Sequence, residues 1–126
     1  MRSVIISIVI FIVILLLIFL SMFYVSHESK ETSEILEQLK TSVEKGDWAS
    51  ANVQNEVLKA KWDKDKGILA FLFDHFELDN IQISFSRLDK YIYCKDTLTS
   101  LSEISVVKML IEHLPKRDSL TLDNLL

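Results

Sequence analysis

Residues 73–80, with the sequence FDHFELDN, hold the densest group of side chains that could do chemistry. The candidate metal ligands in this segment are one imidazole and three carboxylates: His75, Asp74, Glu77 and Asp79. A metal site needs three or four such groups to converge on one point. A single short segment can supply that convergence only from a corner with unusual geometry. The alternative is an ordinary corner between two helices.

The helix-corner interpretation explains most of these residues. Asp79 precedes a clear amphipathic run, so it can cap the exposed N–H groups of the helix that follows. His75 then lies at the end of the preceding helix, where the helix dipole favours a positive charge. Phe73, Phe76 and Leu78 are expected to pack the corner. We therefore interpret the segment as structural and predict no catalytic residue, no metal and no cofactor.

The remaining candidate residues are isolated. Trp48 and Trp62 lie about four helical turns apart, so they share one face of a helix. They either anchor the core or line a groove for a ligand or partner, with their indole N–H groups as donors. Glu112 and His113 are adjacent on a helix and point in different directions, so they do not form a catalytic dyad. Cys94 is the only cysteine, which excludes a disulfide framework and a thiolate metal site. No serine hydrolase or zinc protease motif is present, and we expect no enzyme activity.

The first element is an apolar segment from Val4 to Val25 that contains no charged residue. Its small polar residues are Ser7 and Ser21 alone. As a helix these 22 residues extend roughly 33 Å, against roughly 30 Å for the hydrocarbon core of a bilayer. The sequence therefore predicts a transmembrane helix in contact with lipid through residues 4–25.

Two alternatives to an anchor are a cleaved signal peptide and a buried core helix. A signal peptide has a shorter apolar region followed by small residues, whereas this run ends in the aromatic belt of residues 22–24. A core helix would need cover on every face. We predict an anchor over residues 1–26 and a domain over residues 27–126. Arg2 before the run and the acidic stretch after it favour a single-pass cell-membrane protein with a cytoplasmic N-terminus and an extracytoplasmic domain.

The rest of the chain is typical of an all-α protein, because 126 residues contain only two glycines and one proline. Apolar residues recur at helical spacing in four segments: 35–43, 48–76, 81–92 and 101–114. With the N-terminal transmembrane helix, they predict a small antiparallel bundle of about four helices. Trp48, Trp62, Phe85 and Ile104 are expected inside it.

The expected helix ends follow from capping residues and breakers. No breaker separates the anchor from residue 45, so we expect the membrane helix to run directly into the first bundle helix. Gly46 and Asp47 suit a C-terminal cap followed by an N-cap, and Asp96 and Thr97 resemble a second corner. The second helix is expected to reach about Asp74. The fourth is expected to stop before Pro115, with Ser119 capping a final short turn.

Charge excludes one class of partner. The segment after the anchor keeps all 18 acidic residues and all but one of the 14 basic residues, and it contains no basic run. Nucleic-acid binding is therefore not expected.

The layout resembles the domain-of-unknown-function family 4363 of bacterial membrane-anchored proteins over nearly the whole chain. The matching features, besides the anchor, are KGDWASA at 45–51, KWDKDK at 61–66, FDHFELDNI at 73–81, RLDKYI at 87–92 and LTLDNLL at the end. The resemblance implies an origin in spore-forming Gram-positive bacteria and no assigned activity or catalytic residue. Genes of this kind can lie beside genes for small multi-pass membrane proteins, which implies a membrane partner.

We therefore expect a non-enzymatic, membrane-anchored accessory protein whose bundle binds a multi-pass membrane protein or an envelope protein. The alternative is a small-ligand or metal-binding helical module centred on His75 and the Trp48/Trp62 face.

Overall fold

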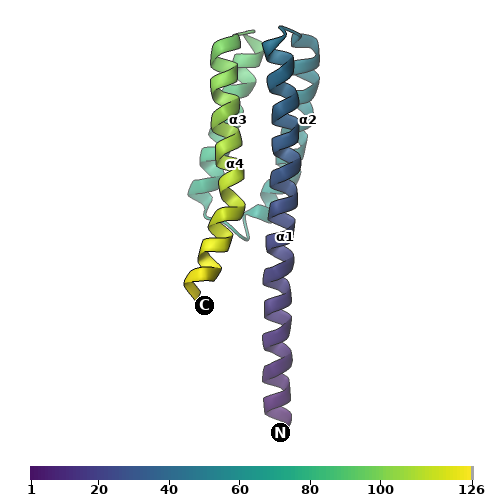
Figure 1. The fold of residues 1–126 in the computed structure, drawn as a ribbon, viewed down its shortest axis with the longest axis vertical. Coiled ribbons are helices and arrows are strands. Elements are labelled where there is room, and N and C mark those ends of the chain that lie inside the picture. Colours follow the sequence, from purple (N-terminus) through teal and green to yellow (C-terminus); the bar gives the residue numbers. More distant parts are fainter. Residues whose placement is uncertain (126) are drawn as a thin grey trace.

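Four helices make up the chain in the computed structural model, which describes residues 1–125 and the surroundings of side chains as far as residue 116 (Figure 1). The helices are α1 (Arg2–Glu44), α2 (Trp48–Leu69), α3 (His75–Tyr93) and α4 (Thr97–Leu125). They alternate in direction, and each packs against the next, with α1 also packing against α4. Within the described residues the diagonal pairs, α1 with α3 and α2 with α4, make no close backbone approach. The predicted all-α antiparallel bundle is confirmed.

Most buried positions of each helix recur at alternating steps of four and three residues, and Ser42, Ser84 and Glu103 are buried next to members of this repeat. The residues of the repeat are Val25, Ser29, Thr32, Leu36, Leu39 and Val43 in α1; Ala51, Asn55, Leu58, Trp62, Asp65 and Leu69 in α2; Leu78, Ile81, Phe85, Leu88 and Ile92 in α3; and Ser100, Ile104, Val107, Ile111 and Leu114 in α4. A seven-residue repeat of this kind keeps one seam of each helix facing its neighbours, as in coiled coils and four-helix bundles. The repeat therefore accounts for the nearly parallel packing of long helices around a narrow core.

Three of the four residues expected inside the bundle are buried there. Trp62, Phe85 and Ile104 belong to the core, and the rings of Trp62 and Phe85 lie 5.2 Å apart between their centroids. Trp48 is only half-buried, because it opens α2 at the end of the bundle and packs against the core from its edge.

The N-terminal part of α1 extends beyond the other three helices, past the end of α4 (Figure 1). An 18-residue window in it has a mean hydropathy of 3.5 with no residue buried, so by length and composition α1 is able to cross a membrane. As predicted, the helix continues without a break into the bundle, and the boundary drawn after residue 26 falls inside it.

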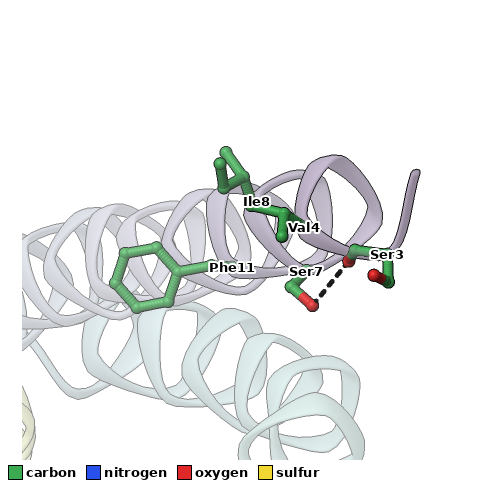
Figure 2. Close-up of a pocket in the computed structure, with 5 residues that line it drawn as sticks. All are labelled: Ser3, Val4, Ser7, Ile8 and Phe11. Carbon is green, nitrogen blue, oxygen red and sulfur yellow. Dashed lines mark hydrogen bonds between the residues drawn. The ribbon is translucent and has the colours of Figure 1, made fainter. Parts of the chain in front are cut away.

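The serines of the apolar segment do not leave unpaired hydroxyl groups. Ser7 Oγ donates to the Ser3 carbonyl oxygen at 2.9 Å, beside a shallow hollow on the helix surface (Figure 2). Ser21 Oγ donates in the same way to the Ile18 carbonyl at 2.8 Å. Because an unpaired polar group is costly in hydrocarbon, these internal bonds make both serines compatible with a lipid environment.

The two corners at the far end of the bundle share one geometry. At the α1–α2 corner, Gly46 adopts a left-handed φ of +70°, and the amides of Gly46 and Asp47 bond back to the carbonyls of Val43 and Ser42. This is a Schellman cap. Asp47 then caps α2 by accepting from the Ser50 amide at 3.2 Å. Both predicted roles at this corner are confirmed.

The α3–α4 corner repeats the pattern with a lysine in the left-handed position. Lys95 has a φ of +55°, and the amides of Lys95 and Asp96 bond to the carbonyls of Ile92 and Tyr91. Asp96 accepts from the Thr99 amide at 3.2 Å, which confirms the predicted corner and starts α4. A side chain in the left-handed region is strained, so Lys95 carries a backbone cost that Gly46 avoids.

The corner at residues 70–74 differs from the prediction. The second helix ends at Leu69 rather than near Asp74, because the buried repeat of α2 ends there and the chain turns back. The N-cap of α3 is Asp74, with an extended backbone and a carboxylate that accepts from the Phe76 amide at 3.2 Å. The assignment of Asp79 as the cap was therefore wrong. His75 begins α3 instead of ending α2, so the expected dipole stabilisation of its positive charge was also wrong.

The fourth helix passes through Pro115 instead of stopping before it, so Ser119 does not start a new helix; its side chain lies outside the described surroundings. Proline lacks the N–H that would bond the Ile111 carbonyl. Ser29 of α1 replaces this donor, because its Oγ donates to that carbonyl at 3.0 Å. A tertiary hydrogen bond thus satisfies the carbonyl that the proline leaves open, and the last turns of α4 lean away from α1 (Figure 1).

The paired corners predict opposite effects of two substitutions. Gly46→Ala should lower the free energy of unfolding by about 1 kcal/mol, because it forces a Cβ into the left-handed region without meeting any neighbour. Lys95→Gly should raise it by less than about 1 kcal/mol, because it removes the same strain but adds entropy to the unfolded chain. Urea unfolding of the full chain in detergent, followed by circular dichroism, measures both. Effects of the same sign would contradict this account of the corners.

Candidate functional site at the base of the bundle

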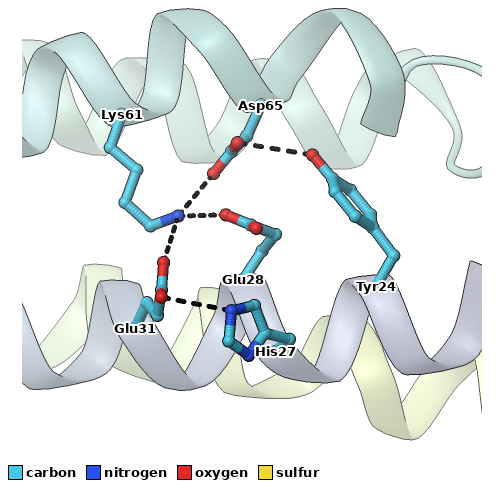
Figure 3. A network of polar contacts seen from close by, with 6 residues as sticks. All are labelled: Tyr24, His27, Glu28, Glu31, Lys61 and Asp65. Atoms are coloured by element: carbon cyan, nitrogen blue, oxygen red, sulfur yellow. Dashed lines mark hydrogen bonds and ion pairs between the residues drawn. The ribbon is translucent and has the colours of Figure 1, made fainter.

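An ionic cluster joins α1 to α2 where the apolar half of α1 enters the bundle (Figure 3). We call it the base cluster, and its members are Tyr24, His27, Glu28, Glu31, Lys61 and Asp65. The first four lie in residues 24–31 of α1, and the last two lie one turn apart on α2. The cluster begins at the last residues of the uncharged run, so it lies where the sequence of α1 changes from apolar to charged.

The Lys61 ammonium is the centre of the cluster. Its Nζ lies 2.9 Å from Asp65 Oδ2 and 3.4 Å from Glu31 Oε2, and it also contacts the Glu28 carboxylate. Tyr24 Oη donates to Asp65 Oδ1 at 3.4 Å on the apolar side. On the opposite side, His27 Nε2 lies 3.1 Å from Glu31 Oε1. One cation is therefore shared by three carboxylates drawn from two helices.

Burial divides the cluster into an inner and an outer part. The Asp65 side chain is only 4% exposed and the Lys61 side chain 13%, while His27 and Glu31 face solvent. Charges this far from water are stable only when they are paired and hydrogen-bonded. The inner part is thus a buried ion pair whose partners depend on each other.

The pKa shifts follow from burial and from the shared ammonium. Burial opposes the charge on Lys61, but hydrogen bonds to Glu28 and Asp65 outweigh burial and raise the pKa of Lys61. For Asp65 burial dominates, and the pKa rises despite the hydrogen bond from Lys61. Burial also acts to raise the pKa of Glu28, but hydrogen bonds with Lys61 and Asp65 outweigh it and lower that pKa. Asp65 is therefore the carboxyl group of this pair that holds a proton more readily.

The base cluster also contains the side chains best placed for a cation. Ligand atoms of His27, Glu28 and Glu31 lie within 4.8 Å of one another, which is a geometry that a metal ion could use. Lys61 already lies against both glutamates, so a metal would have to displace its ammonium. As they stand, the contacts of this cluster are ion pairs that hold α1 and α2 together.

The four residues considered as metal ligands from the sequence lie elsewhere, around the start of α3. Asp74 is the N-cap, His75 the first helical residue, Glu77 a half-buried residue of the first turn, and Asp79 an exposed residue of the second turn. Among the described residues, the group of three ligand-type side chains that does converge is the one in the base cluster. On the face carrying Trp48 and Trp62, the Trp62 indole N–H already donates to Gln82 Oε1 at 2.7 Å, so this donor is used within the bundle.

A family model described as a domain of unknown function, DUF4363, matches residues 19–125. The chain belongs to this family. The match confirms the resemblance inferred from the sequence, and it includes the base cluster and the whole bundle. No match was found among curated proteins or among solved structures.

Sequence reasoning missed the base cluster of this DUF4363 chain, although one signal for it was present. Asp65 occupies a buried position of the α2 repeat, three residues after Trp62 and four before Leu69. A charged residue at such a position requires a partner, and Lys61 lies one turn before it. The repeat did not reveal that the other partners come from α1. Asn55 is a second polar residue in the same register, and its amide donates to Asp89 of α3 at 2.8 Å.

The DUF4363 bundle also has a groove on its outer surface between α3 and α4. Its volume is about 380 Å³, and it is lined by Phe76, Glu77, Asn80, Ile81, Met109, Leu110, His113 and Leu114. Phe76 and Met109 are 72% and 52% exposed, so the groove presents apolar surface to the outside. The expectation that Phe76 packs inside the corner was wrong, whereas Leu78 is buried and Phe73 packs against the core.

The base cluster predicts a large difference between two lysines that are two residues apart. Lys61→Met should lower the free energy of unfolding by about 3–5 kcal/mol, because it leaves the buried Asp65 carboxyl group and the half-buried Glu28 carboxyl group without their cation. Lys59→Met should cost less than about 1 kcal/mol, because Lys59 is 40% exposed and its pairs with Glu56 and Asp89 are exposed as well. Urea unfolding of the full chain checks both values. Equal costs would show that the cluster does not lock the helices.

The pKa shifts predict opposite pH dependence for two neutral variants. The raised pKa of Asp65 stabilises the fold at low pH, and this contribution is lost as pH rises through the folded-state pKa. Asp65→Asn should therefore gain stability relative to the parent protein as pH rises from about 3 to 7. The lowered pKa of Glu28 has the opposite sign, so Glu28→Gln should lose relative stability over the same range. Unfolding curves at several pH values test this pair, and the same trend in both variants would refute the assignment.

Proposed function

We propose that this chain is a single-pass cell-membrane protein whose extracytoplasmic bundle binds another membrane or envelope protein and catalyses no reaction. The anchor supports this proposal because it keeps the bundle beside other membrane proteins. The cytoplasmic placement of the N-terminus is supported by Arg2 before the apolar run and by the acidic residues that follow it.

The observation that carries the binding proposal is the groove between α3 and α4. Its apolar lining on the outer surface is what a helix needs to bury a nonpolar face, and the lining also includes the polar side chains of Asn80 and His113. Phe76 and Met109 of the groove do not belong to the core cluster, so their exposed apolar surface remains available to a partner.

The direction of the groove favours a particular kind of partner. The two helices that form it run along the bundle axis, and α1 leaves the bundle along the same axis (Figure 1). A helix seated in the groove would therefore point toward the bilayer as α1 does. We propose that the occupant is a helical segment that continues from a transmembrane span of a multi-pass protein.

Site-specific photo-crosslinking in native membranes tests this proposal. A photoreactive amino acid at Met109 in the groove should give one discrete crosslinked product with a membrane protein. The matched control is Val53, which is also apolar and exposed but lies on α2, the helix diagonal to α4. Position 53 should give no such product, and Met109→Glu should reduce co-purification of the crosslinked partner without unfolding the bundle. Products of equal yield at both positions, or none at 109, would contradict the proposal.

A further inference from the structure

The end of the bundle that faces the apolar half of α1 carries an unusual amount of exposed apolar surface. It lies at the α2–α3 corner, where Phe71 is 91% exposed. Ile68 and Leu72 beside it are exposed as well. We call these three residues the base patch. They belong neither to the core, nor to the base cluster, nor to the lining of the α3–α4 groove.

The register between α1 and α2 places the base patch at the level of the membrane segment. The two helices are antiparallel, and Asp65 is bonded to Tyr24, within the last residues of the uncharged run. From Asp65, α2 continues for another turn toward the N-terminal end of α1 before it ends at Leu69. The corner at residues 70–74 therefore lies beside the upper part of the apolar run of α1, as Figure 1 shows. At this level Phe19, Leu20 and Phe23 are exposed, whereas Ile18, Ser21, Met22 and Tyr24 are half-buried.

The backbone of the corner suits an environment with little water. The amides of residues 70, 71, 72 and 73 all bond to carbonyls of α2, at 2.9 to 3.1 Å. Because unpaired backbone donors are costly outside water, this internal pairing removes the main obstacle to burial in lipid. The exposed carboxylate of Asp74 limits the depth, since a charged group stays with the polar headgroups.

We propose that the base patch inserts into the interfacial layer of the lipid bilayer, so that the bundle stands on the membrane through two attachments, α1 and the α2–α3 corner. This inference rests on the membrane span of the proposed function. The bilayer is the favoured partner because the base patch lies at the same height along the bundle axis as the exposed apolar residues of α1. Apolar side chains such as Phe71 and Leu72 are suited to the boundary between headgroups and acyl chains.

Lipid-quenched fluorescence of the full chain in vesicles tests the proposal. The single cysteine, Cys94, is exposed and lies at the opposite end of the bundle, so a fluorophore on it is a matched control on the parent protein. In a Cys94→Ser background, Ala70→Cys places the same fluorophore beside Phe71 without removing any base-patch residue. Phe11→Cys in that background reports on the span itself. The vesicles contain phosphatidylcholine spin-labelled either near the headgroup or in the middle of the acyl chain.

The expected result is quenching of the position-70 probe by the shallow spin label, quenching of the position-11 probe by the deep label, and no quenching at Cys94. Adding Phe71→Ser to Ala70→Cys should reduce the shallow quenching, with unchanged circular dichroism. If position 11 is quenched but position 70 is not, the base patch stays off the membrane and the inference is wrong while the span stands. If position 11 is unquenched, the proposed span itself fails. A position-70 probe that is shielded from aqueous iodide but unquenched by either lipid indicates a protein contact and overturns lipid insertion.

Discussion

The unbroken backbone of α1 is the constraint on which the rest of the structure depends. No glycine or proline occurs between Arg2 and Glu44, and the first glycine of the chain is Gly46, just after the helix ends. A helix of 43 residues is roughly 65 Å long, more than twice the thickness of a bilayer core. Its first half is uniformly apolar and its second half presents a seven-residue repeat. The orientation of one half therefore determines the orientation of the other, with no linker to absorb a difference.

The base cluster lies where these two halves meet. Tyr24 is among the last residues of the uncharged run, and Glu28 and Glu31 are among the first acidic residues after it. Their contacts with Lys61 and Asp65 join α2 to α1 in a single register, because a shift of one turn would leave buried charges without partners. Buried ion pairs contribute less to stability than apolar packing of similar volume, and their best-attested role is to specify one arrangement among several. In this protein that arrangement also sets the level of the α2–α3 corner relative to the apolar run.

Most of the fold was predictable from the sequence because it depends on local signals. Gly46 and Asp96 mark corners through backbone and capping chemistry that acts within a few residues. The errors arose where distant residues decide the outcome. Asp74 and Asp79 are both acceptable caps, and the choice depends on where the buried repeats of α2 and α3 end and begin. Proline normally ends a helix, but α4 passes through Pro115 because Ser29, 82 residues before Ile111, supplies the missing donor to the Ile111 carbonyl.

The candidate site was less predictable for the same reason. Asp65 carries a local signal, since it interrupts the apolar repeat of α2, but its partners on α1 can be identified only after the two helices are placed side by side. Exposure of Phe76 was likewise invisible to periodicity, which placed it on the stripe of the wrong helix. Periodicity identifies the apolar side chains of each helix, whereas the register between helices determines which of them the bundle covers.

The central claim, that α1 is one rigid helix from the apolar run into the bundle, is tested most directly by a distance measurement. Spin labels at Phe11 and Thr41, both exposed, in a Cys94→Ser background allow pulsed electron–electron double resonance on the full chain in lipid nanodiscs. A continuous helix predicts a single narrow distribution centred near about 45 Å. A broad distribution, or one centred at a much shorter distance, would indicate a hinge between the apolar run and the bundle and would contradict the account.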